Sequence, residues 1–429
     1  MKTVIKHICQ LSLVATCVSA SFSVMAEKIA ITGAQIYTMS AAGIIENGTV
    51  LIDNGKIQQV LDNKRVPSGY REIDASGKVI TPGFVGALTS LGLEEVSLSA
   101  GVVDARVEPH AVSSVGAAYD VQYAINKDSS LIPITRVEGF TSAVTGISRT
   151  DQLFEGQGAV ISLNNELSST LKARAYVHVD VGNSGMHANG ESRAALWVAL
   201  NQSLDEAIFA STHDLSPSQG WEGMISRADA KALIPVIKGE TPLLVTAHRA
   251  GDILQALDIQ SRYSDVKLVL VAATEGWRVA AQIAEANVPV ILNPENNLPG
   301  DFDQLGSTME NAGRLHKAGV KVAIGMETHN IRLAAQHAGN AVANGLPHNA
   351  GLASLTSNVA SIFGVDEIGS LAPGKRADLV VWSGDPLEVT EAAELVMIEG
   401  EEIPMTSRQI QLRDRYLKRS TDKPVGYFR

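Results

Sequence analysis

The sequence has few cysteines, few aromatic residues and no long apolar run beyond its start. Of its 429 residues, 5% are aromatic and two are cysteines, Cys9 and Cys17. Both cysteines lie within the first 26 residues, so the remainder has no disulfide, thiolate nucleophile or thiolate metal ligand. Lys and Arg number 35 against 46 Asp and Glu, which argues against nucleic acid or an anionic membrane surface as the main partner.

Residues 1–26 have the features of a secretory signal peptide. Lys2 and Lys6 precede an apolar run, and Val24-Met25-Ala26 places compact residues before Glu27. Cleavage after Ala26 is expected, because signal peptidase requires such residues at the last and third-last positions. The apolar run is too short to span a bilayer comfortably. The sequence therefore predicts an exported protein, periplasmic or secreted, that is not inserted in the membrane after signal removal.

Two kinds of pattern divide the remaining chain. Residues 27–80 and 371–429 contain short β-type runs separated by turn signals such as Asn54-Gly55. Residues 81–370 contain apolar strands followed by amphipathic helices, most clearly from TPLLVTAH to VKVAIGM. We expect an α/β fold, in which residues 81–370 form a TIM-like (β/α)8 barrel and both chain ends form one composite β-sandwich side domain.

The region between about Leu91 and Ile234 is harder to interpret, because long polar stretches interrupt it. Strands are expected at LIPITRV, GAVISL and ARAYVHVD. In the last of these, His178 and Asp180 alternate along one strand face and would point into the barrel together. The glycines of Gly156-Gln157-Gly158 do not form a phosphate-binding motif.

Five segments carry a resemblance to a known family: VLIDNGKIQQV, IDASGKVITPGFVGA, VTAHRAGDILQAL, VAIGMETH and LTSNVASIFGVDEIGSLAPGKRADLVVWSGDP. In these segments the chain resembles the amidohydrolase superfamily, in the branch of imidazolonepropionase-like and prolidase-like enzymes. The resemblance implies hydrolysis of an amide, peptide or cyclic C–N bond in a small-molecule substrate. It also implies a divalent metal, zinc above all, that activates water. The oligomeric state is left open, a homo-oligomer included.

The metal ligands of that family are largely replaced in this sequence. Family members carry His-x-His after the first barrel strand, where Leu88 and Ser90 stand here, and Gly86 occupies the place of the usual aspartate. His248 falls on the fifth-strand metal histidine and Glu327 on the eighth-strand aspartate, whereas VAATEG lacks the sixth-strand histidine. A catalytic zinc generally has three protein ligands. The resemblance therefore implies a degenerate site, with His248 and Glu327 as the remaining metal-ligand candidates.

Three residues are candidates for catalysis: Glu327, His248 and His329. Glu327 would inherit the proton shuttle of the family, and His248 would ligate a metal or polarise the substrate carbonyl. Glu327 and His329 lie in one loop, so the carboxylate would orient the imidazole for general-base catalysis. The alternative for this pair is a solvated loop without chemistry.

Glu275, Trp277 and Glu94 are candidates for substrate binding. Glu275 and Trp277 follow the sixth strand, where an acid beside an aromatic ring suits a cationic ligand; Glu275 equally suits a helix N-terminus. Glu94 stands beside Glu95, close to the replaced histidines. Three functions remain open: a hydrolase with a degenerate metal site, a non-catalytic protein that binds a small molecule or partner, and a metal-independent hydrolase that uses Glu327, His329 and His248.

Overall fold

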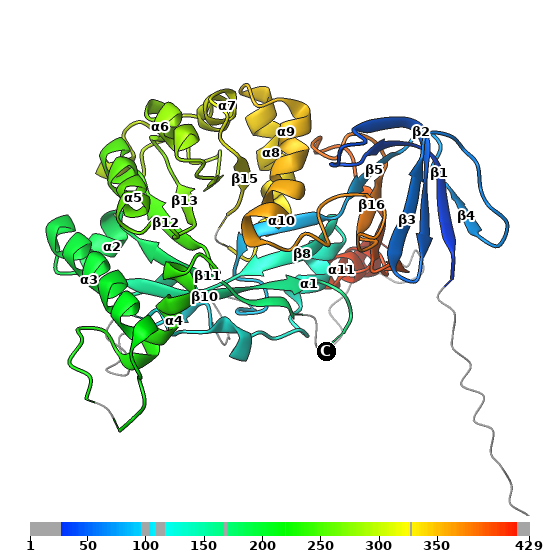
Figure 1. The fold of residues 1–429 in the computed structure, drawn as a ribbon. Helices are drawn as coiled ribbons and strands as arrows, with labels where there is room; N and C mark the ends of the chain where they lie inside the picture. Colours follow the sequence, from blue (N-terminus) through cyan, green and yellow to red (C-terminus); the bar gives the residue numbers. More distant parts are fainter. Residues whose placement is uncertain are drawn as a thin grey trace, which may run out of the picture.

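The computed structural model describes residues 27–95, 103–108, 116–166, 170–218, 220–326 and 328–417 (Figure 1). The expected signal peptide and the candidate Glu327 lie outside the described residues. In the described part of the chain, no helix combines the length and apolar character needed to cross a membrane. Two eight-stranded sheets dominate the described fold, together with a two-stranded ribbon of β7 (Arg106–Val107) and β9 (Arg149–Thr150).

The side sheet combines strands from both ends of the chain (Figure 1). β5 and β16 join the ends as antiparallel partners, with Ile80 opposite Val381. Asn54 and Gly55 both have positive φ, 51° and 72°, in the tight turn between β2 and β3, as the Asn-Gly pair predicts. The strands are β1 (Ile29–Tyr37), β2 (Ile44–Asp53), β3 (Lys56–Leu61), β4 (Arg71–Asp74), β5 (Val79–Pro82), β16 (Leu379–Trp382), β17 (Ala393–Ile398) and β18 (Glu401–Glu402).

The second sheet curves into a barrel, which confirms the TIM-like fold. Its order is β15-β14-β13-β12-β11-β10-β8-β6. The sheet is nearly closed, because a Cβ placed on Gly325 beyond β15 would lie 3.3 Å from the Ala87 side chain of β6. The strands are β6 (Phe84–Thr89), β8 (Phe140–Thr145), β10 (Phe154–Ser162), β11 (Thr170–Asp180), β12 (Leu243–Ala247), β13 (Leu268–Ala272), β14 (Val290–Leu292) and β15 (Val322–Ile324).

One strand of the barrel, β10, is antiparallel to the others. β10 pairs antiparallel with both β8 and β11, whereas β6–β8 and the pairs from β11 to β15 are parallel. The start of β10 therefore lies at the same edge as the carboxyl ends of β11 and β12. This reversal departs from the regular strand–helix alternation expected over residues 81–370.

Helices cover the outside of the second half of the barrel, where the amphipathic pattern is clearest (Figure 1). The α-helices between β6 and β16 are α1 (Leu131–Arg136), α2 (Asn183–Ala188), α3 (Arg193–Thr212), α4 (Arg227–Ile237), α5 (Ala250–Arg262), α6 (Ala280–Glu285), α7 (Asn311–Lys317), α8 (Ala334–Ala343), α9 (His348–Ser354) and α10 (Ser357–Phe363). Short 3-10 turns occur at η1 (Val121–Tyr123), η2 (Gly276–Arg278), η3 (Phe302–Gln304) and η4 (Ile331–Leu333).

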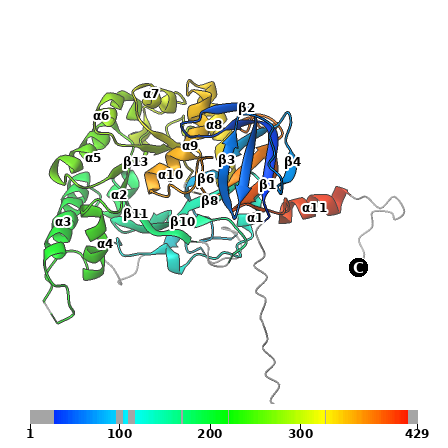
Figure 2. The ribbon, with the colours of Figure 1, turned by 45° about the vertical axis from the view of Figure 1, so that its right-hand side comes forward.

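Two segments expected as strands or β-structure are helical instead. LIPITRV forms α1, in which Ile132, Thr135 and Arg136 are buried at helical spacing and Pro133 stands in the first turn, where no backbone donor is lost. The chain end, expected as part of an all-β unit, contains α11 (Arg408–Leu417), which extends beyond the side sheet in Figure 2. Its sequence RQIQLRDRYL is rich in straight-chain residues, which favour the helix.

The inside of the barrel is apolar at one end and polar at the other. Tyr176 of β11 and Leu244 of β12 belong to the interior apolar cluster, which Phe363 and Val365 close at the amino ends of the strands. Residues at alternate positions, such as Val177 and Val245, face the helices. Further along the interior face, His178 and Asp180 follow Tyr176, and Thr246 and His248 follow Leu244. The alternation thus brings four polar side chains to the carboxyl ends of two neighbouring strands.

A buried ion pair connects the two sheets. Arg376 donates through Nε to both carboxylate oxygens of Asp378, at 2.9 and 3.0 Å, and through Nη2 to the Ser162 hydroxyl at the end of β10. Asp378 is only 2% exposed, and burial raises the pKa of its carboxyl in spite of the guanidinium. The arginine therefore holds the start of β16 against the barrel.

Candidate functional site

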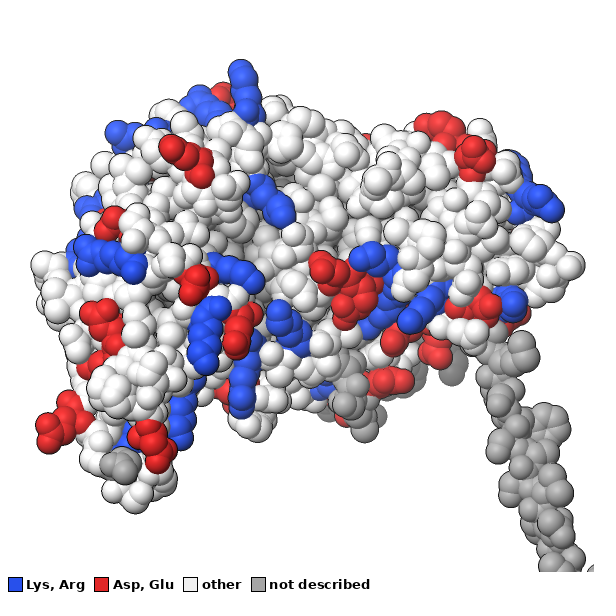
Figure 3. Space-filling model, in the orientation of Figure 1, with Lys and Arg blue, Asp and Glu red and all other residues white. Residues whose placement is uncertain are grey.

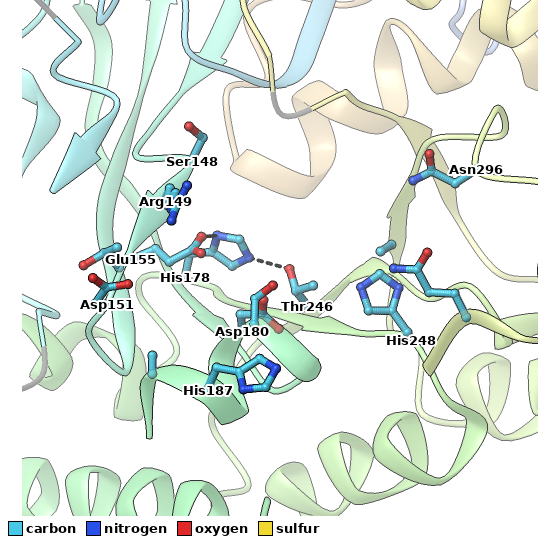
Figure 4. A pocket seen from close by; sticks show the side chains of 15 residues that line it. Ser148, Arg149, Asp151, Glu155, His178, Asp180, His187, Thr246, His248 and Asn296 are labelled. Atoms are coloured by element: carbon cyan, nitrogen blue, oxygen red, sulfur yellow. Dashed lines mark hydrogen bonds and ion pairs between the residues drawn. The ribbon is translucent and has the colours of Figure 1, made fainter. Parts of the chain in front are cut away.

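A cavity of about 780 Å³ opens at the carboxyl ends of β11 and β12 (Figure 4). Barrel enzymes place their chemistry at this end of the strands. The polar side chains at its floor come from the interior face: His178, Asp180, Thr246 and His248. The segment from Ser148 to Asp151, with Glu155 and part of α2, forms the side. On the face of the molecule shown in Figure 3, acidic and basic side chains are interspersed.

His178 lies between an acidic side chain and a hydroxyl (Figure 4). Its Nδ1 is 2.5 Å from Oε2 of Glu155, and its Nε2 is 2.8 Å from Oγ1 of Thr246. The imidazole is 6% exposed and the Glu155 side chain 15% exposed, so water screens the pair weakly. An acid, an imidazole and a hydroxyl in this order form the arrangement by which a base activates a nucleophile.

A β-bulge at the start of β10 places Glu155 beside His178. Phe154 pairs with Val179 and Gly156 with His178, which leaves Glu155 as the extra residue between them. Gly156 has φ +86°, and a Cβ there would lie 2.8 Å from the carbonyl oxygen of Tyr119. Only glycine therefore fits the bulge, and the bulge sets the direction of the Glu155 side chain.

His248 also lies on the cavity floor, on the side of Asp180 away from His178. A Cβ on Gly182 would lie 3.0 Å from Oδ1 of Asp180 and 3.1 Å from Cδ2 of His248, so the two side chains meet around this glycine. Nδ1 of His248 is 2.7 Å from the Thr274 hydroxyl. Burial lowers the pKa of His248, and the negative charges of Asp303 and Asp252 act in the opposite direction. The imidazole is consequently neutral at pH 7 and available as a hydrogen-bonding group.

Two alanines with left-handed backbone stand at the end of β13, Ala272 as its last residue and Ala273 directly after it. Ala272 has φ 64° and Ala273 has φ 40°, and Ala272 contributes to the cavity lining. Residues with a Cβ adopt this conformation at a cost of roughly 1–2 kcal/mol each. Such strain gathers at functional sites, where the surrounding structure enforces it.

The chain matches known proteins in sequence and in fold. Residues 264–404 match the family model described as the amidohydrolase family. The crystal structure of an amidohydrolase from Thermotoga maritima aligns with a TM-score of 0.77 and 26% identity, over 88% of this chain and 99% of that chain. The chain matches the amidohydrolase superfamily in sequence over residues 264–404 and in its fold. This confirms the family inferred from the sequence.

Other relatives are more distant or partial. A dihydroorotase from Listeria monocytogenes is 27% identical over 280 residues, and the match covers 61% of this chain and 61% of that protein. A prolidase complexed with N-methylphosphonate-L-proline shares the fold at a TM-score of 0.53 and 16% identity, over 88% of this chain and 99% of that chain. The prolidase-like neighbours thus agree with the fold of the predicted branch.

Leu88 and Ser90, which the resemblance places at the first-strand metal positions, contact other groups in the structure. Leu88 is 4% exposed and belongs to the apolar cluster of the barrel interior. The Ser90 hydroxyl donates to Oε1 of Glu94 at 2.5 Å. Among the residues that the structure describes, which exclude Glu327, no group of three or more His, Asp or Glu side chains converges to hold a metal ion. The described residues thus supply fewer than the three convergent protein ligands that a catalytic zinc generally has.

Glu94 and His329, predicted separately, lie together but outside this cavity. Nδ1 of His329 is 2.6 Å from Oε1 of Glu94, the same oxygen that accepts the Ser90 hydroxyl. His329 lines a smaller hollow of about 230 Å³ near α1. Glu94 is thus the described acid that holds His329, in the role that the sequence assigned to Glu327.

Glu275 and Trp277 make structural contacts away from the cavity lining. Oε2 of Glu275 accepts hydrogen bonds from the Ala250 backbone at the start of α5, at 3.0 Å, and from Arg278 at 2.9 Å. The Trp277 indole donates to the Gly306 carbonyl at 2.8 Å, and its ring lies 4.6 Å from the Arg314 guanidinium carbon. The placement fits the alternative of an acid at a helix N-terminus, with α5 as the helix it stabilises.

Glu155 and Thr246 are the site residues that the sequence reasoning missed. Thr246 stands two positions before His248 in VTAH, on the same strand face, and this spacing was the available signal. Glu155 had no comparable signal, because it lies at the start of a strand whose direction is reversed and reaches the cavity through a bulge. His178 and Asp180 line the cavity together, as their alternate spacing predicts.

Proposed function

We propose that the protein is an exported hydrolase that cleaves an amide, peptide or cyclic C–N bond and whose superfamily metal site is degenerate. One observation carries the proposal: an imidazole held by a carboxylate lies at the carboxyl ends of the barrel strands, inside a polar cavity. The superfamily assigns hydrolytic chemistry to this end of the barrel. The signal-like residues 1–26 support export, to the periplasm or outside the cell.

In this proposal His178 is the general base. A carboxylate only accepts hydrogen bonds, so the contact with Glu155 assigns the proton to Nδ1 and leaves Nε2 as the basic nitrogen. Glu155 also stabilises the imidazolium that forms when Nε2 takes a proton. His248, kept neutral by burial, would polarise the substrate carbonyl from the other side of the cavity. No step in this scheme requires a metal-bound water.

The names of the relatives suggest a first set of substrates. A dihydroorotase relative points to cyclic amides, and a prolidase neighbour points to dipeptides that end in proline. A cavity of about 780 Å³ with a polar lining accommodates a molecule of either class. We therefore propose a small polar amide as the partner, with no role for nucleic acid.

A second candidate function is a non-catalytic binding protein on the same barrel. Leu88 favours it, because an apolar side chain replaces a metal ligand in the barrel interior. The two candidates differ in what substitution at His178 should do. In the hydrolase, His178→Asn abolishes turnover, whereas in the binding protein it only changes ligand affinity.

The test combines metal content with turnover. The protein without residues 1–26, purified in the absence of chelator, is analysed for zinc and manganese and assayed with dihydroorotate, Xaa-Pro dipeptides and other cyclic amides. We expect turnover of one class that persists in EDTA and is lost in His178→Asn. Turnover that requires about one equivalent of bound metal would contradict the degenerate site. Saturable binding without turnover would favour the binding protein.

A further inference from the structure

The hydroxyl of Thr246 lies where a catalytic nucleophile would stand. Its Oγ1 is 2.8 Å from Nε2 of His178, the nitrogen that carries no proton when Nδ1 donates to Glu155. Thr246 lines the cavity and is 7% exposed, so a ligand in the cavity reaches a hydroxyl that bulk water reaches poorly. We propose that Thr246 attacks the substrate carbonyl and forms an acyl-enzyme, with His178 as the base and Glu155 as its positioning residue. This inference rests on the proposed hydrolase function and names its nucleophile.

Three neighbouring strands hold the three groups in a fixed order. Glu155 comes from β10, His178 from β11 and Thr246 from β12. Asp180 is opposite Thr246 in the β11–β12 register, so His178 stands one interior position deeper and its ring reaches across to the hydroxyl. Because all three residues belong to paired strands, little conformational freedom is lost when substrate binds.

A second cluster in the same molecule has the same residue types in a different order. In Ser90, Glu94 and His329, the carboxylate lies between the hydroxyl and the imidazole, and both donate to its Oε1. A carboxylate in the middle accepts from both neighbours and passes no proton from hydroxyl to imidazole. In Glu155, His178 and Thr246 the imidazole lies in the middle, the order in which a base takes the hydroxyl proton.

The reaction balances with water as the only co-reactant. Oγ1 of Thr246 bonds to the carbonyl carbon while its proton passes to Nε2 of His178, which gives a tetrahedral oxyanion. The oxyanion collapses, the C–N bond breaks, and His178 returns the proton to the leaving nitrogen, which leaves an ester on Thr246. Water then attacks this ester, gives one proton to His178, and releases the carboxylic acid. Transfer of that proton to Oγ1 restores the threonine.

His248 has the placement to stabilise the oxyanion. It stands two residues beyond Thr246 on the same strand face and lines the same cavity. Nδ1 of His248 is 2.7 Å from the Thr274 hydroxyl, and in the tautomer in which Nδ1 accepts that hydroxyl proton, Nε2–H donates to the developing charge.

A β-lactone probe tests the nucleophile directly, because its ring opens on an activated hydroxyl and leaves a stable ester. The protein without residues 1–26 is treated with the probe, digested and examined by mass spectrometry. We expect one adduct, on Thr246, in the wild type. Thr246→Ser should keep the adduct and Thr246→Ala should lose it. Ser90→Ala is the matched control, because it removes a buried hydroxyl from the other cluster, and it should be labelled on Thr246 like the wild type.

Amide turnover supplies the second readout. Thr246→Ala should lower kcat by about 10²-fold or more, and Thr246→Ser should restore part of it. Turnover that survives in Thr246→Ala, with no adduct in the wild type, overturns the nucleophile and leaves the proposed hydrolase standing. An adduct on Thr246 without turnover of any C–N substrate supports the nucleophile and overturns the hydrolase. Absence of both adduct and turnover overturns both.

Discussion

The carboxylate of Glu155 and the imidazole of His178 are 2.5 Å apart, although they stand on strands that run in opposite directions. The reversal of β10 brings the start of one strand to the end of the other, and the bulge turns the acid toward the ring. The position and orientation of the His178 imidazole therefore depend on the backbone of β10 as well as on that of β11.

Glu155→Gln tests whether this carboxylate acts through His178. The substitution keeps the shape but removes the charge that stabilises the imidazolium. We expect kcat to fall by about 10²–10⁴-fold. The acid limb of the kcat–pH profile should move to lower pH, since the imidazolium loses its counter-charge. A variant with an unshifted pH profile and wild-type kcat would assign Glu155 a structural role only.

Gly156→Ala tests the bulge, with Gly319→Ala as its control. Both glycines have positive φ, +86° and +94°, but a Cβ at 156 meets the Tyr119 backbone at 2.8 Å, whereas at 319 nothing lies within 4 Å. The control should cost about 1–2 kcal/mol from backbone strain alone. Gly156→Ala should cost about 1–3 kcal/mol more and should also lower turnover. Urea unfolding gives both values, and equal losses would show that the bulge tolerates the methyl group.

His248→Gln tests the stability effect of a buried neutral histidine. Burial lowers the folded-state pKa of His248 below the ordinary histidine value of 6.5. As the pH falls below about 6.5, the unfolded chain takes up the proton first, so the free energy of unfolding decreases until the folded-state pKa is reached. The variant should lose this part of the pH dependence. His187→Gln, at an exposed side chain, is the control and should keep the wild-type slope.

The buried pair Arg376–Asp378 offers a further stability test. Arg376→Met leaves the Asp378 carboxylate buried without its guanidinium, which should cost about 3–5 kcal/mol. The double variant Arg376→Met, Asp378→Asn should be more stable than this single variant, because no charge then remains buried. Chemical denaturation of the wild type, the double variant and both single variants, Arg376→Met and Asp378→Asn, gives the coupling free energy. Losses that simply add would show that the pair contributes no coupling.

Local patterns predicted much of the fold. The Asn54-Gly55 turn and the strands of β11 to β15 follow from turn chemistry and apolar periodicity, which depend on neighbours in sequence. LIPITRV was misassigned because its β-branched residues resemble a strand, and only burial of Ile132 and Thr135 decides for the helix. The direction of β10 depends on which strands it pairs with, and no local pattern records that choice.

The site was predictable only where its residues share a strand. His178 with Asp180 follows from alternate spacing, and His248 followed from its match to the superfamily. The contact between Glu94 and His329 spans 235 positions, and neither residue's spacing points to the other. Glu155 reaches the site through a β-bulge that shifts the strand register by one residue. A strictly alternating strand pattern does not predict such a shift.

The surroundings of Gly86 and Leu88 do not accommodate the aspartate and the histidine that the resemblance to the superfamily would place there. A Cβ at Gly86 would lie 2.8 Å from Cγ1 of Ile331 and 2.9 Å from Cγ2 of Thr89, so the superfamily's usual aspartate has no room there. A histidine at position 88 would bring a polar ring into the apolar interior. A chain that regained the metal ligands would first have to repack η4 and the barrel interior. An aspartate at position 86 together with a histidine at position 88 would therefore destabilise the barrel before either side chain could hold a metal.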